Sequence, residues 1–193
     1  MARFESWRGV AIASVLALGL LGCSDRGYVT PPPQATNATL NSRRADQHPR
    51  LSYNGRYLVF ASDRRNQRHI FVYDQQRRQL LTLPGLNQPG TLHDQPDISA
   101  DGRYIVYVSE QLGKPDIFIY DRQTLSATPI TRDLLGEVRH PTISGDGRFV
   151  AFETNRSGQW DIEIYDRGAG VGRSLPQSPN NDDPPPAPDA AAE

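Results

Sequence analysis

The sequence contains one cysteine, Cys23, no long hydrophobic run and almost no net charge. A single cysteine cannot form an intramolecular disulfide, so a disulfide-stapled scaffold is excluded. The formal net charge is -1 at pH 7, whereas a domain that binds nucleic acid normally concentrates basic residues into a positive field. The composition therefore gives no reason to expect a nucleic-acid partner.

The short motifs of common catalytic and metal sites are also absent. The sequence has no G-x-S-x-G nucleophile elbow, no C-x-x-C pair, no H-E-x-x-H pair and no Walker phosphate-binding loop. We therefore expect a protein that is not an enzyme, with no catalytic residue, no metal site and no cofactor.

Residues 1–22 have the features of an export signal. Arg3 and Arg8 give a positively charged start, and Gly9 to Leu21 is an uncharged, mostly apolar run of 13 residues. This run is shorter than the roughly 20 residues that a membrane-spanning helix needs, and it fits the apolar segment of a signal peptide. We therefore predict that residues 1–22 are a signal peptide.

The apolar run ends at Leu20-Leu21-Gly22-Cys23, which resembles the lipobox of bacterial lipoproteins. The resemblance implies that Cys23 is lipidated, and acyl chains on this residue would hold the protein at a membrane surface. Ordinary signal-peptide cleavage beside an incidental cysteine is the alternative. The same resemblance implies a location in the bacterial cell envelope, facing the periplasm, and with Ser24 after the cysteine it implies the outer membrane rather than the inner one. Residues 23–39 would form a flexible linker.

Three segments of the sequence are copies of one repeat. Each contains Pro-x-x-Ser, a turn, an apolar run and a Tyr-Asp pair. The turn glycines, Gly55, Gly102 and Gly147, are 47 and 45 residues apart. The Tyr-Asp pairs, which begin at residues 73, 120 and 165, repeat the same two intervals. Two landmarks with the same spacing indicate a structural repeat of about 45 residues.

Each copy has the pattern of a small antiparallel sheet. A short strand precedes each turn, a run rich in β-branched and aromatic residues follows it, and a second apolar run ends in Tyr-Asp. A fourth, weaker strand is expected within residues 79–83, 127–131 and 173–175. The turn pairs are typical of tight hairpins in which both central residues have positive φ: Asn54-Gly55, Asp101-Gly102 and Asp146-Gly147.

The pattern Pro-x-x-Ser-x-Asp-Gly-Arg, followed by an apolar strand and Ile-x-x-Tyr-Asp, resembles the WD40-like PD40 repeat of TolB-like β-propellers. The first copy has Asn54 in place of the aspartate. The resemblance implies an all-β fold of three four-stranded blades, which is a partial TolB-like propeller. It covers residues 40–176, with copies at about 40–84, 85–131 and 132–176.

Regular propellers have about 4–8 blades, so three blades would leave the array open. An open array exposes the apolar faces of its first and last sheets. Association of two copies as a homodimer with a six-bladed ring would cover both faces, and capping by the ends of the chain is the alternative. Residues 177–193 are acidic and rich in proline and alanine, which predicts a disordered tail.

Loops at one end of the expected blades supply the candidate interaction residues. In an up-and-down sheet, the segment before the first strand lies at the same end as the loop between the second and third strands. A metal site at this rim is the alternative, but no metal-ligand spacing supports one, and matching repeat positions favour a structural role for the histidines at 48 and 140. Six residues are expected at the rim: His48, Arg64, Arg68, His93, His140 and Arg156.

The resemblance to TolB-like proteins implies a protein-interaction module in cell-envelope organisation or transport, with envelope proteins as partners and a membrane contact through lipid. Two other functions stay open. One is binding of a small ligand, such as a sugar or a peptide, and the other is an accessory role beside an envelope enzyme. A repeat that specifies a fold does not by itself specify a task.

Overall fold

A computed structural model describes residues 39–172 and 174, all of which belong to one compact unit, residues 32–193. The predicted signal peptide, Cys23 and the tail 177–193 lie outside the described residues, as does nearly all of the predicted linker. The described part is built from strands and contains no helix, so the all-β prediction is confirmed. Within it, no helix exists that could cross a membrane.

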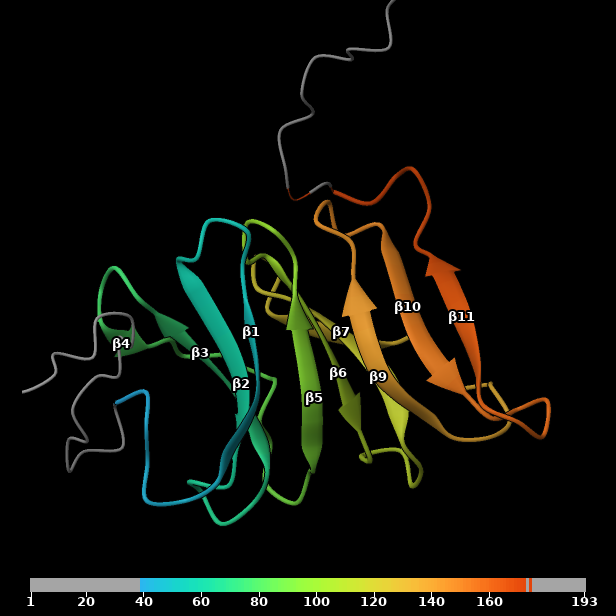
Figure 1. The fold of residues 1–193 in the computed structure, drawn as a ribbon, viewed down its shortest axis with the longest axis horizontal. Coiled ribbons are helices and arrows are strands. Elements are labelled where there is room, and N and C mark those ends of the chain that lie inside the picture. Colours follow the sequence, from blue (N-terminus) through green and yellow to red (C-terminus); the bar gives the residue numbers. More distant parts are fainter. Residues whose placement is uncertain (1–38, 173, 175–193) are drawn as a thin grey trace, which may run out of the picture. The chain divides into compact units, whose positions relative to one another are not determined.

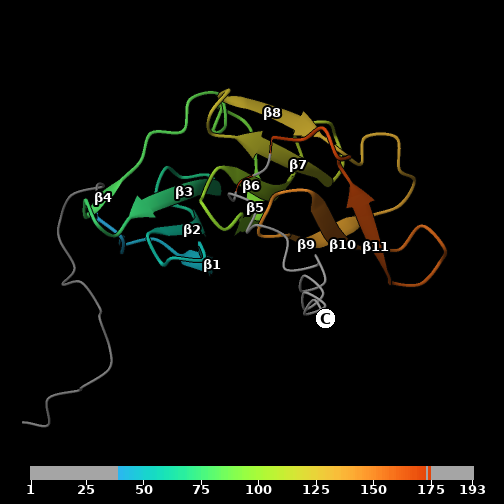
Figure 2. The same cartoon turned by 90° about the horizontal axis from the view of Figure 1, so that it is seen from above.

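The strands of the described part form three antiparallel sheets, one for each repeat (Figure 1). Blade 1 contains β1 (Asp46–Leu51), β2 (Tyr57–Ser62), β3 (His69–Asp74) and β4 (Gln79–Leu80). Blade 2 contains β5 (His93–Ile98), β6 (Tyr104–Ser109), β7 (Asp116–Asp121) and β8 (Ser126–Pro129). Blade 3 contains β9 (Val138–Ile143), β10 (Phe149–Thr154) and β11 (Asp161–Asp166). Figure 2 shows the order β5-β6-β7-β8 of blade 2 from above.

The predicted fourth strands are present in blades 1 and 2, as β4 and β8, whereas blade 3 has three strands within the described residues. The strand expected at 173–175 falls on a segment of which only Ser174 is described. The Ser174 amide donates to the Asp146 carbonyl oxygen at 3.0 Å, and its hydroxyl donates to Asp101 Oδ1 at 2.6 Å. This residue therefore joins the turns of blades 2 and 3 and does not pair with β11.

The turns between the first two strands of each blade differ from the predicted hairpins. Five residues separate the strands, 52–56 in blade 1, and the residue before the glycine closes the turn with its side chain. Asp101 Oδ1 accepts hydrogen bonds from the Arg103 amide at 2.8 Å and the Ser99 hydroxyl at 3.1 Å. In each turn pair only the glycine has positive φ: Gly55 at 68°, Gly102 at 82° and Gly147 at 78°. The prediction that both central residues have positive φ is therefore wrong.

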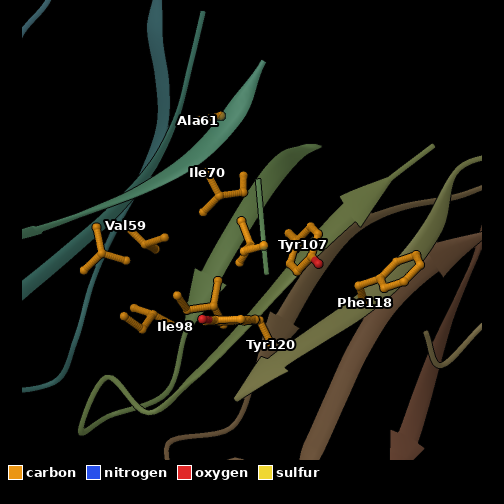
Figure 3. Close-up of a cluster of buried hydrophobic side chains, with 10 residues drawn as sticks. Val59, Ala61, Ile70, Ile98, Tyr107, Phe118 and Tyr120 are labelled. Atoms are coloured by element: carbon orange, nitrogen blue, oxygen red, sulfur yellow. The ribbon is translucent and has the colours of Figure 1, made fainter. Parts of the chain in front are cut away.

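The apolar cores lie between the blades. One cluster joins blades 1 and 2 and includes Val59, Ile98 and Tyr107 (Figure 3). A second cluster joins blades 2 and 3 and includes Val106 and Val150. Because neighbouring residues of β6 contribute to different clusters, this strand is apolar on both faces, as expected for a sheet enclosed between two others.

Both junctions between blades contain the same contact, which we call the ring-on-glycine contact. The ring of Tyr57 in blade 1 lies against Gly102 in blade 2, and the ring of Tyr104 in blade 2 lies against Gly147 in blade 3. A Cβ on either glycine would overlap the ring. These two positions therefore need glycine for the close approach as well as for the positive φ.

An arginine of the following blade completes each ring-on-glycine contact. The Arg122 guanidinium lies 4.5 Å from the Tyr57 ring centroid and donates to the Gly102 carbonyl oxygen at 2.6 Å. Arg167 lies 4.0 Å from the Tyr104 ring centroid and donates to the carbonyl oxygen of Gly147. A guanidinium over an aromatic face is attractive because the ring carries negative charge on its faces.

Candidate functional site

A depression of about 410 Å³ lies between blades 1 and 2, at the end of the sheets opposite the glycine turns. Its walls are the loop that joins β2 to β3, the start of β5 and the end of β6. We call this depression the rim site. It is lined by Asp63, Asn66, Gln67, Arg68, Leu92, His93, Asp94, Val108 and Glu110.

A set of charged side chains links the two blades across the rim site. Arg68 Nη1 donates to Asp94 Oδ2 at 2.9 Å, and Arg68 Nε donates to Asp63 Oδ1 at 3.0 Å. His48 Nδ1 lies 2.8 Å from the other oxygen of Asp94. Asp94 of blade 2 thus holds two basic groups of blade 1, and this fixes the positions of the walls relative to each other.

The protonation states of this set follow from these contacts. Burial alone would raise the pKa of Asp94, but the hydrogen bonds from Arg68, the Gln95 amide and His48 lower it below the usual range. Hydrogen bonds to Asp63 and Asp94 raise the pKa of Arg68. The Arg68 guanidinium and the Asp94 carboxylate therefore stay charged at neutral pH.

Two histidines lie beneath the rim site. His69 at the start of β3 is 5% exposed, His93 at the start of β5 is fully buried, and their ring centroids are 6.1 Å apart. The rings of His93 and Tyr107 pack edge to face, with 5.0 Å between their centroids. Burial and the neighbouring His69 lower the pKa of His93 to about 4. Because both rings are buried, they belong to the core of the junction.

The structure brings only part of the predicted rim set together. His48, Arg68 and His93 meet at the rim site. His140 is joined to blade 2 through its amide, which donates to Gln95 Oε1 at 2.6 Å. Arg156 pairs with a glutamate of its own blade.

Arg64 lies elsewhere, on the face of blade 1 that points away from blade 2. Its guanidinium stacks on Phe60 and Phe71, at 5.0 and 4.8 Å from the ring centroids. The Arg64 side chain is only 2% exposed, and it donates to the Leu40 carbonyl oxygen and to Asp46. Arg64 and His93 are therefore both buried, and neither can contact a partner while this packing is intact.

Among the described residues, no group of three or more His, Cys, Asp and Glu side chains is placed to hold a metal ion.

A repeated backbone feature at the rim was missed by the sequence reasoning. The first strand of each blade has a register shift at the residue before proline, and this residue has positive φ. Positive φ is uncommon for residues other than glycine. Its recurrence at one repeat position indicates a structural bulge, and the Pro-x-x-Ser pattern was the only sequence signal. The three residues are His48 at 52°, Gln95 at 51° and His140 at 49°.

An ion pair within each blade was also missed. The arginine after each turn glycine pairs with the aspartate of Tyr-Asp: Arg103 Nη2 lies 2.8 Å from Asp121 Oδ2, and Arg148 Nη2 lies 2.6 Å from Asp166 Oδ2. The aspartates also accept backbone amides of the next turn, which is a common role of aspartate in turns. The constant distance of 18 residues between arginine and aspartate could have indicated the pairing.

The model of the TolB β-propeller domain family matches residues 33–192. The chain belongs to the TolB β-propeller domain family. No curated protein matches the sequence.

Solved structures of TolB share the fold. TolB from Acinetobacter baumannii is 21% identical with a TM-score of 0.56, and the match covers 68% of this chain and 32% of that one. A protein assigned as TolB in Agrobacterium tumefaciens is 22% identical with a TM-score of 0.54, and the match covers 71% of this chain and 50% of that one. This member of the TolB family therefore spans half or less of those proteins, and the likeness shows the fold alone.

A peptidase is also among the similar solved structures. The puromycin-hydrolyzing peptidase of Mycobacterium tuberculosis is 14% identical with a TM-score of 0.49, and the match covers 72% of this chain and 23% of that one. This likeness carries no argument about activity, because propeller domains occur in proteins of many functions.

Proposed function

We propose that this protein is a non-catalytic, lipid-anchored module of the bacterial cell envelope that binds other envelope proteins through the rim site. The rim site carries the proposal, because it is a depression with walls from two blades and a lining of charged and polar side chains. Membership in the TolB β-propeller domain family supports a binding module of this fold. The export features of residues 1–22 and the lipobox ending at Cys23 support the location.

The rim site is suited to binding because its walls are already held in place. The bond from Arg68 to Asp94 joins the two blades before any partner arrives, and preorganisation reduces the entropy lost on binding. Glu110 lines the site and is exposed. A complementary basic or amide-rich segment of a partner would find fixed acceptors there.

Photocrosslinking in the intact envelope tests this function. A photoreactive amino acid replaces Glu110 in the full chain, and a matched control carries it at Leu125, a 48% exposed turn residue at the other end of blade 2. We expect a particular envelope protein to be captured from position 110 and not from position 125. Capture of no envelope protein, or equal capture from both positions, would show that the rim site is not a protein-binding surface.

Charge reversal gives a second readout of the same proposal. Glu110→Lys should reduce recovery of the captured protein about ten-fold, because reversing a complementary charge at this site costs roughly 1.4 kcal/mol. Leu125→Lys is the control and should leave recovery unchanged. Unchanged recovery with Glu110→Lys would contradict a role for this carboxylate.

Location has its own test. Labelled fatty acid should be incorporated into the full chain and not into a Cys23→Ala variant, since Cys23 is the only cysteine. Fractionation should place the labelled protein with the outer membrane. Equal labelling of both chains would contradict lipidation at Cys23.

Binding of a sugar or a short peptide at the rim site is the second candidate function. The volume of about 410 Å³ falls within the range of roughly 300–1,000 Å³ that is usual for small-molecule sites. A ligand that binds only the folded protein raises its melting temperature. A rise that disappears in Glu110→Lys, together with no protein captured at position 110, would favour this candidate.

A further inference from the structure

Blade 3 carries one half of a third ring-on-glycine contact. Phe149 occupies the repeat position of Tyr57 and Tyr104, but it is 39% exposed whereas Tyr104 is 2% exposed. On the same face of blade 3, Ile162 and Ile164 are each 68% exposed. The residues of blade 2 at their repeat positions, 117 and 119, are at most 5% exposed because blade 3 covers them. Within the described residues, this face of blade 3 is therefore a blade junction without its second blade.

Blade 1 carries the other half of the contact. Gly55 has the positive φ of the other turn glycines, 68°, but a Cβ added to it would meet no atom within 4 Å. Leu51 at the end of β1 and Tyr53 in this turn are 57% and 89% exposed. Their counterparts in blade 2, Ile98 and Ala100, are 5% and 8% exposed. Gly55 of blade 1 thus has the conformation of the other two turn glycines, and the space beside it is open to an aromatic ring.

Backbone hydrogen bonds between the blades follow the same direction. The Tyr53 amide of blade 1 donates to the Ala100 carbonyl oxygen of blade 2, and the Ala100 amide donates to the Gly145 carbonyl oxygen of blade 3, both at 3.0 Å. Within the part of the chain that the structure describes, this series leaves a donor at the Gly145 amide and an acceptor at the Tyr53 carbonyl oxygen. The unused donor is next to Phe149 on blade 3, and the unused acceptor is next to Gly55 on blade 1.

We propose that two copies of this chain associate head to tail, with Phe149 of one copy packed on Gly55 of the other. The contact would continue the two junctions already present, with the Gly145 amide donating to the partner's Tyr53 carbonyl oxygen. Gln75 supports the fit: it occupies the position of Arg122 and Arg167, and its Nε2 donates to the Gly55 carbonyl oxygen at 2.6 Å, as those arginines do at their glycines.

The proposed contact uses an open part of blade 1. Leu40 and Arg64 cover the outer face of blade 1 toward the loop 63–68. The turn between β1 and β2, which contains Gly55, lies at the opposite end of the strands (Figure 1). Each copy offers one aromatic side chain, Phe149, and one open turn glycine, Gly55. Two such contacts therefore close a symmetric assembly of two copies. Three described blades from each copy would give six, within the usual range of about 4–8 for propellers. This inference does not depend on the rim site, which lies at the other end of the blades.

Crosslinking from position 149 tests the association. The full chain carries a photoreactive phenylalanine derivative in place of Phe149 and is irradiated in its native envelope. We expect a product of twice the chain mass in which position 149 is linked to residues 51–56 of a second copy. Absence of this product, or linkage only to other proteins or to other residues of this chain, would overturn the proposal.

Variants with separable effects complete the test. Two differently tagged full chains are coexpressed, and recovery of one with the other is measured. Phe149→Asp should reduce recovery about ten-fold or more, as expected for a buried aromatic anchor, while Phe149→Tyr, which restores the residue of the other two blades, should retain it. Leu135→Asp is the control, since Leu135 is 85% exposed in the loop between β8 and β9. Equal recovery for Phe149→Asp and Leu135→Asp, with both variants resistant to protease, would overturn the proposal.

Discussion

At the scale of single residues, His93 makes the folded protein sensitive to acid. Its ring is fully buried between His69 and Tyr107, and a protonated ring there would be a charge without solvation. Burial and His69 therefore lower the pKa of His93 from 6.5 to about 4. The unfolded chain binds this proton more readily than the folded one, so protons favour unfolding between these two values.

The first prediction concerns stability between pH 6.5 and 4. The contribution of neutral His93 to the free energy of unfolding should be fully present above pH 6.5. It should fall as the pH is lowered, by about 3 kcal/mol at pH 4. The lowered pKa values of Asp94 and Asp121 affect stability mainly below 3.8, so they contribute little in this window. Denaturant unfolding at several pH values measures the change.

A variant assigns the acid sensitivity to the buried ring. His93→Phe should reduce the pH dependence of the unfolding free energy, because the apolar ring cannot bind a proton. A smaller dependence should remain, because burial also lowers the pKa of His69. His140→Gln is the matched control, since His140 is exposed and the repeat has glutamine at the equivalent position, Gln95. The same slope in His93→Phe and the parent chain would mean that another group is responsible.

At the scale of strands and turns, the arginine over each ring-on-glycine contact stabilises the junction. Blade 1 has Gln75 where the later blades have Arg122 and Arg167, so the chain contains its own comparison. Gln75 keeps the hydrogen bond to the glycine carbonyl. Arg122 has both that bond and the stacking on Tyr57.

The second prediction follows from this difference. Arg122→Gln should lower the free energy of unfolding by about 1 kcal/mol through loss of the stacking, and Arg122→Ala by roughly 1 kcal/mol more through loss of the hydrogen bond. The midpoint of denaturant unfolding measures both changes. If the two variants were equally stable, the hydrogen bond to Gly102 would contribute nothing.

The elements differ in how far the sequence predicts them. The strands that follow the glycine turns were predictable because turn glycine and Tyr-Asp repeat at the same intervals, 47 and 45 residues. The bulge at His48, Gln95 and His140 was not predictable, since none of the three is glycine, the residue type that usually marks positive φ. The rim site was predicted only in part. His48 and Arg68 meet there through Asp94, which lies in another repeat and had no motif to identify it.

At the scale of the three blades, the two outer faces are treated differently. Blade 1 and blade 3 both have arginine at the same repeat position, Arg64 and Arg156. Arg64 folds over its own sheet and binds Asp46 and the carbonyl oxygens of Thr39 and Leu40. Arg156 is 58% exposed and pairs with Glu163, which lies beside the core residue Phe152 on the face toward blade 2. The outer face of blade 3 exposes Ile162 and Ile164, each 68% exposed. One end of the array is thus partly closed by its own chain, which corrects the expectation that both outer faces are exposed.

The third prediction concerns this cap. Arg64→Leu should lower the free energy of unfolding by about 3 kcal/mol, because it leaves Asp46 with one fewer partner in a partly buried site and removes the stacking on Phe60 and Phe71. Hydrogen exchange should show the loss first in β1–β4, since the cap holds the segment before β1 against this sheet. Arg156→Leu tests the equivalent position and should change stability by less than about 1 kcal/mol. Equal losses in the two variants, or faster exchange in blade 3 rather than blade 1, would mean that Arg64 does not close the first face.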